Sequence, residues 1–169
     1  MSDPQDIEAR GEVEAPLPER RVILAQVMLP ADANPSGDVH GGTLMKLADT
    51  AGGIAAVRHT HRRVVTAIAD SMTFEHPVKV GDLVLIDAEV SWVGRTSVEV
   101  EVSVFTEKVV TGERRRTSLA YFVFVALGAD GRPHEVPPLE LRTQAERDRF
   151  NRAEERRRFR LAQRGHPSS

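Results

Sequence analysis

The fold is decided by residues 42–58, which read GTLMKLADTAGGIAAVR. Apolar residues recur there at helical spacing, as at Leu44, Leu47 and Ala51. The opposite stripe consists mostly of small residues and includes one carboxylate, Asp49. Because a helix that is apolar or small on nearly every side is typically buried, we predict a central helix that is covered all round.

Segments with strand character surround this helix. Residues 21–29 precede it, and four runs follow, at residues 64–74, 83–93, 97–108 and 115–125. In the third run valines alternate with polar residues, which predicts a half-buried antiparallel strand. Gly94 and Arg95 suit a tight two-residue hairpin before it. We therefore predict an α+β fold, in which an antiparallel sheet of about five strands wraps around one long helix.

The chain divides into three parts. Residues 1–20 are polar and contain prolines without an apolar pattern, which predicts a disordered extension. Residues 21–139 form the compact domain, and residues 140–169 form an arginine-rich tail. Thr143 and Glu146 predict a capping box at the start of a tail helix. Acids and bases three or four residues apart predict that this helix is solvated on the surface. These pairs are Glu146 with Arg149, Asp148 with Arg152, and Glu154 with Arg158.

The composition excludes several classes of protein. The 169 residues include no cysteine, which excludes thiolate nucleophiles, disulfides and Cys-ligated metals. We find neither a secretory signal pattern nor a run of about 18 apolar residues, and therefore expect a cytoplasmic protein. Residues 140–164 carry nine Arg and five acidic residues, a charge of +4, whereas the other 14 basic and 20 acidic residues give −6.

The loop before the central helix is the strongest candidate site. It contains Asn34, His40, Gly41 and Gly42, and it leads into a helix N-terminus that favours negative charge. A Walker phosphate site would need a lysine, which is absent, and a dinucleotide site would need a parallel β-α-β unit. An oxyanion hole for a hydrolytic reaction is the remaining chemistry.

Asp49 is the candidate general base, because partial burial suits a carboxylate for that role. The alternative is a surface pair with Lys46. Gly52 and Gly53, which are unfavourable in a helix, favour the site, since a ligand or partner helix would have to approach closely there. Asn34 either orients a water or carbonyl, or stabilises the loop as an Asn turn.

Other chemistries have weaker support. His59 and His61 could bind a metal, but no third ligand is evident, so we expect no metal and assign them as surface residues after the helix. No serine lies in a G-x-S-x-G motif, which argues against a serine nucleophile.

Two stretches resemble a known family: residues 32–59, DANPSGDVHGGTLMKLADTAGGIAAVRH, and residues 63–82, RVVTAIADSMTFEHPVKVGD. They resemble the hotdog-fold acyl-CoA thioesterases, of the cytosolic acyl-CoA hydrolase type and its bacterial broad-specificity relatives. The likeness extends from about Arg21 to the arginine-rich tail. It implies a hotdog fold, a sheet wrapped around one helix, which agrees with the architecture expected from the sequence pattern.

The resemblance also implies the chemistry. The substrate would be a coenzyme A thioester, hydrolysed to fatty acid and CoA without a further cofactor. Asp49 would be the base or nucleophile, Asn34 would face it from the other protomer of a dimer, and Gly42 would provide an oxyanion-hole N–H. A dimer would be the minimal unit, and a trimer of dimers, a homohexamer, is expected from the bacterial relatives.

Substrate binding is expected near both ends of the acyl-CoA. His40 and Gly41 are assigned to the substrate-binding residues, with His40 as a cap or supporting residue. The resemblance places the hairpin Gly94, Arg95, Thr96 and Ser97 near the path of CoA, where Arg95 could bind a phosphate and the hydroxyls could donate hydrogen bonds. An exposed polar turn is the alternative for the hairpin.

Two other functions stay open, a hotdog-fold acyl-CoA dehydratase and a non-catalytic module that binds acyl-CoA or a nucleotide. The tail arginines alternate with acids, so neither nucleic acid nor a membrane is expected as a partner. An acidic body repels a polyanionic substrate. Basic residues such as Arg95, or the tail of a neighbouring protomer, are therefore expected near the CoA.

Overall fold

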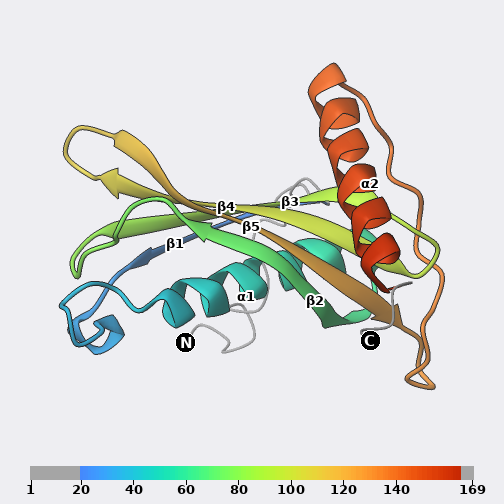
Figure 1. Cartoon of the computed structure of the whole chain (residues 1–169), viewed down its shortest axis with the longest axis horizontal. Coiled ribbons are helices and arrows are strands. Elements are labelled where there is room, and N and C mark those ends of the chain that lie inside the picture. The colour runs from blue at the N-terminus through green and yellow to red at the C-terminus, as the bar shows by residue number, and fades with distance from the viewer. Residues whose placement is uncertain (1–19, 165–169) are drawn as a thin grey trace, which may run out of the picture.

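The computed structural model describes residues 20–164, which form one five-stranded antiparallel sheet and two long helices (Figure 1). The elements are β1 Arg21–Val27, a short 3-10 helix Pro30–Asp32, α1 Gly41–Thr60, β2 Arg63–Phe74, β3 Leu83–Val93, β4 Ser97–Lys108, β5 Glu113–Leu127 and α2 Gln144–Arg164. The strand order is β1-β3-β4-β5-β2, so β1 and β2 are the edges of the sheet. The expected disordered extension lies outside the described residues, except for Arg20.

The inner face of the sheet packs against α1. Alternate residues of the three central strands build this face, and none is more than 3% exposed: Val84, Ile86, Ala88 and Val90 of β3, Val98, Val100, Val102 and Val104 of β4, and Ala120, Phe122 and Phe124 of β5. Ala48, Ala51 and Ala55 of α1 are fully buried in the same core. The predicted hotdog fold, one helix wrapped by an antiparallel sheet, is confirmed.

The prediction that α1 is buried on every side is wrong for the single chain. Met45, Ile54 and Val57 lie on the helix surface that the sheet does not reach, and they are 36–42% exposed. One sheet can cover only one side of a helix, so a second surface would have to cover these residues. Ile54 and Val57 are three residues apart and so are neighbours on the helix surface, and adjacent exposed apolar side chains are typical of a protein–protein contact.

Helix α2 lies on the opposite, outer face of the sheet (Figure 1). Its capping box is confirmed, since Thr143 Oγ1 accepts from the Glu146 N–H at 3.2 Å and Glu146 Oε2 accepts from the Thr143 N–H at 3.1 Å. Donation from the backbone N–H groups of Arg142 and Thr143 lowers the pKa of the Glu146 carboxyl. The capping box therefore sets the N-terminus of α2 at the position that the sequence predicts.

The prediction of a solvated tail helix is wrong for the side of α2 that faces the sheet. Ala153 is fully buried, and Arg149 binds Glu89 and Glu101 of the sheet at 2.8 and 3.4 Å instead of pairing with a residue of its own helix. The expected pair of Arg158 with Glu154 does form, at 3.3 Å. Carboxylates of the sheet compete with those of the helix for the arginines of α2. The spacing of residues along the helix cannot reveal these sheet partners.

The β3–β4 connection has three residues, 94–96, rather than the predicted two. Gly94 does not have a positive φ, so a left-handed backbone conformation is not what requires a glycine there. A Cβ atom at Gly94 would lie 2.5 Å from the Trp92 ring, a distance that real Cβ atoms do not show. The glycine is required because the indole folds back over the turn.

We expect Gly94→Ala to lower the free energy of unfolding by about 1–3 kcal/mol, because the indole has to move out of its packed position. Urea denaturation followed by the emission of Trp92, the single tryptophan of the chain, measures this loss. Arg95→Ala changes the exposed next residue of the turn and should cost less than about 0.5 kcal/mol. Equal stability of Gly94→Ala and the wild type would contradict the packing argument.

Candidate active site

The loop before α1 is closed by the side chain of Asn34. Its Oδ1 accepts hydrogen bonds from the N–H groups of Ser36 at 2.9 Å and Asp38 at 3.2 Å. This is the Asn turn that the sequence left as an alternative. Within residues 20–164 the side-chain NH₂ group of Asn34 makes no hydrogen bond, so it remains available as a donor.

The N-terminus of α1 is capped by His40. Its Nδ1 accepts from the Gly42 N–H at 3.0 Å. Gly42, the residue expected to donate to an oxyanion, is therefore already bonded in this structure. The neighbouring Gly41 N–H has no hydrogen-bond partner in the described part of the chain. The helix end thus offers one free N–H, and a second if the His40 side chain turns away.

Asp49 accepts a hydrogen bond from Thr66, which is not among the residues predicted for the site. The Thr66 hydroxyl of β2 donates to Asp49 Oδ1 at 2.7 Å. Asp49 itself is half-buried, and no ion pair joins it to Lys46 among the described residues, which disfavours the surface-pair alternative. A threonine within the otherwise apolar run VVTAIA was the only sequence signal for this contact.

Asp49 and Thr66 line an open groove of about 410 Å³ between α1 and β2. Its other walls are mainly apolar and include Gly53, Ile54 and Val57. Such a groove suits an extended, largely apolar chain with a reactive group near the carboxylate. The groove is not lined by Asn34, His40 or Gly42. Within one chain, Asp49 therefore meets Thr66 but none of these three predicted site residues.

The two helix glycines have different causes. A Cβ at Gly52 would lie 3.1 Å from two carbons of the Phe124 ring, so the core and not a ligand excludes a side chain there. A Cβ at Gly53 would make only ordinary contact with that ring, and Gly53 faces the groove. The sequence predicted that a ligand or a partner helix approaches these glycines closely. At Gly52 the group that approaches is instead the Phe124 ring of the same chain.

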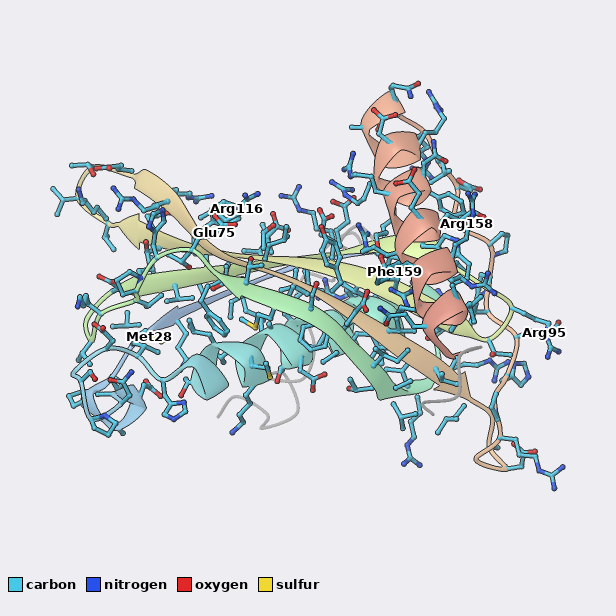
Figure 2. All side chains as sticks on the ribbon, viewed as in Figure 1. Met28, Glu75, Arg95, Arg116, Arg158 and Phe159 are labelled. Carbon is cyan, nitrogen blue, oxygen red and sulfur yellow. The ribbon has the colours of Figure 1, made fainter. Side chains whose placement is uncertain are left out.

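The β3–β4 hairpin lies away from this groove. Thr96 and Ser97 line a separate cavity of about 290 Å³ on the outer face, together with Trp92, Arg157 and Arg160. Arg95 is exposed at the end of the hairpin (Figure 2). The predicted CoA-binding hairpin therefore lies beside two arginines of α2, of which Arg160 is already paired with Asp70 and Glu99.

The two histidines at the C-terminal end of α1 are not equivalent. His59 is 8% exposed and its Nε2 lies 3.0 Å from the Pro137 carbonyl oxygen, so its assignment as a surface residue is wrong. His61 ends the helix in the left-handed conformation, with φ 51°. Residues 20–164 contain no group of three or more His, Cys, Asp or Glu side chains arranged to bind a metal. Neither α1 nor α2 is long and apolar enough to cross a membrane.

Comparisons with known proteins identify the family of this chain. Residues 36–113 match the family model of the thioesterase superfamily. The acyl-CoA thioester hydrolase YciA of Salmonella typhimurium is 38% identical over 123 residues, which cover 71% of this chain and 92% of that protein.

Solved structures give the same result. An acyl-CoA hydrolase of Staphylococcus aureus, in complex with butyryl coenzyme A and coenzyme A, has a TM-score of 0.82 at 34% identity and covers 86% of this chain and 89% of its own. The same enzyme has been solved with alanine in place of an aspartate, an asparagine or a threonine. A hexameric thioesterase of Yersinia pestis has a TM-score of 0.65 at 38% identity and covers 72% of this chain and 99% of its own. The chain therefore belongs to the thioesterase superfamily, and within it to the hotdog-fold acyl-CoA thioester hydrolases.

Proposed function

We propose that this protein hydrolyses acyl-CoA thioesters to a fatty acid and free CoA, with Asp49 as the reacting carboxylate. The observation that carries the proposal is the Asp49–Thr66 hydrogen bond at the wall of an open apolar groove. The bond orients one carboxylate oxygen and leaves the other free. A cytoplasmic location, predicted from the sequence, remains part of the proposal.

The spacing of substituted residues in the Staphylococcus aureus enzyme supports this assignment. Its asparagine and aspartate are 15 residues apart, and its threonine follows the aspartate by 17. Asn34, Asp49 and Thr66 have the same two spacings. All three residue types therefore recur in order and register, including the threonine found here only through its contact with Asp49.

In the proposed reaction Asp49 removes a proton from water as the water oxygen bonds to the thioester carbonyl carbon. The negative charge that develops on the carbonyl oxygen is stabilised by N–H groups at the start of α1, from Gly41 and Gly42. Collapse of the tetrahedral intermediate breaks the C–S bond and releases CoA as its thiol after protonation. Direct attack by Asp49, giving an anhydride that water then cleaves, is the alternative first step. Neither route requires a cofactor.

A second protomer completes the proposed site. The groove at Asp49 is open, and two of its lining residues, Ile54 and Val57, are exposed apolar side chains of α1. We propose a homodimer that covers this side of α1 and brings the partner's free Asn34 amide toward the thioester. Assembly of three such dimers into a hexamer follows the hexameric relative from Yersinia pestis.

The first test of the proposal is the release of free CoA. With purified protein and acyl-CoA, a thiol reagent should detect one CoA per substrate consumed. Asp49→Asn, which keeps the side-chain shape, should lower kcat by about 10²–10⁴-fold because the base is lost. Asp130→Asn, the same substitution at an exposed aspartate in the turn after β5, serves as the control. Consumption of substrate without free thiol would favour the dehydratase instead, and full turnover by Asp49→Asn would exclude Asp49 as base or nucleophile.

Thr66→Val should lower kcat by roughly 10- to 100-fold, since a hydrogen bond to a charged group contributes about 1.5–3 kcal/mol. Thr66→Ser retains the hydroxyl and should recover most of the activity. Steady-state kinetics of the two variants at one substrate chain length compare them directly. Wild-type kcat in Thr66→Val, which keeps the methyl group and lacks the hydroxyl, would show that the hydrogen bond to Asp49 is not required.

Arg95→Gln should raise KM for acyl-CoA about 2- to 5-fold, because one exposed contact with a phosphate is lost. The salt dependence of KM should weaken at the same time. Arg116→Gln is the control, since Arg116 is bound to Glu75 toward the opposite end of the sheet (Figure 2). An unchanged KM and salt slope in Arg95→Gln would remove the hairpin from the CoA site.

A further inference from the structure

A fully buried carboxylate lies beneath α2 on the outer face of the sheet. Glu99 of β4 is 0% exposed, and two arginines of α2 bind it, Arg156 at 2.7 Å and Arg160 at 2.9 Å. The Ser91 hydroxyl donates to the same carboxylate at 3.1 Å. A buried charge without a partner is strongly unfavourable, so this position in the sheet requires α2.

Arg160 differs from Arg156 in making a second ion pair. Its Nη1 also donates to Oδ2 of Asp70 in β2 at 2.6 Å, and both side chains are at most 20% exposed. The guanidinium of Arg156 instead lies 3.7 Å from the ring centre of Tyr121. Arg160 therefore links β4, in the middle of the sheet, to β2 at its edge.

The pairing of strand β2 with β5 is interrupted twice. The register skips Ala67, between Thr66 and Ile68, and it skips Asp70, between Ala69 and Ser71. Bulged residues lack regular ladder pairing, and bulges redirect the side chains next to them. Asp70 is thus the second bulge residue, and the first bulge directly follows the threonine that binds Asp49.

We propose that Arg160 is a positioning residue for Asp49, acting through Asp70 and the bulged segment of β2. The ion pair fixes this segment against the outer face, the segment fixes Thr66, and the Thr66 hydroxyl orients the Asp49 carboxylate. The inference rests on the proposed function, because it assigns a role only if Asp49 reacts. It gives the arginine-rich tail a part in catalysis without contact with the substrate.

Steady-state kinetics of the full-length chain with one acyl-CoA provide the test. Asp70→Asn and Arg160→Gln are each expected to lower kcat about 3- to 10-fold, a typical size for coupling through a packed network. KM should stay within about 2-fold, since the contacts with substrate are unchanged. Wild-type kcat in both variants would overturn the proposal.

A double-mutant cycle separates positioning from general destabilisation. In the Thr66→Val background, Asp70→Asn should lower kcat no further, because Thr66 is the link through which Asp70 acts. If the two substitutions act independently, their effects on kcat multiply, and the proposed route through Thr66 is wrong.

Arg156→Gln is the matched control, since Arg156 shares Glu99 with Arg160 but does not contact Asp70. Both arginine variants should lower the urea midpoint, whereas only Arg160→Gln should lower kcat. An equal loss of kcat in Arg156→Gln would assign the effect to stability and overturn the proposal. If Arg156→Gln does not fold, Asp70→Asn decides the question, because it leaves Glu99 and both arginines in place.

Failure of the proposed function gives a different result. If Asp49→Ala and Thr66→Val retain wild-type turnover, Asp49 is not the reacting group and the function assigned to the groove is wrong. If those two variants lose activity while Asp70→Asn and Arg160→Gln retain kcat, only the positioning role of Arg160 is wrong.

Discussion

The close packing of α1 against the inner face of the sheet is the contact on which the rest of the structure depends. Gly52 and the neighbouring alanines allow the Phe124 ring to lie against the helix backbone, where a larger side chain would not fit. The helix therefore lies close to the strands, and the sheet curves around it. This closeness brings Asp49, less than one helical turn before Gly52, within hydrogen-bond distance of Thr66 on the edge strand.

The two faces of the sheet are stabilised by different forces. The inner face is a continuous apolar core, and its strength comes from the removal of valine, alanine and phenylalanine side chains from water. The outer face under α2 contains a buried carboxylate, Glu99, whose ion-pair partners among the described residues are both arginines of the helix. Such a charged contact specifies one position for α2, because a shifted helix would leave the carboxylate unpaired.

The candidate site is open to solvent in the single chain. The groove beside Asp49 is open, the apolar residues next to it are exposed, and the free amide of Asn34 is not among the groove-lining residues. An edge strand and an uncovered helix side on the same flank of the molecule are consistent with a site shared between protomers. The family to which the chain belongs includes hexameric members, which agrees with this geometry.

The sequence alone predicts the architecture, because the apolar periodicity of α1 and the alternation along β4 depend only on neighbours within each element. It also indicated Asp49, since one carboxylate on an apolar helix is conspicuous without any structure. Only the tertiary structure identified Thr66 and the sheet carboxylates that bind the tail arginines. Thr66 lies 17 residues after Asp49 and Glu99 lies 61 residues before Arg160, so these contacts exist only once the strands and helices have packed.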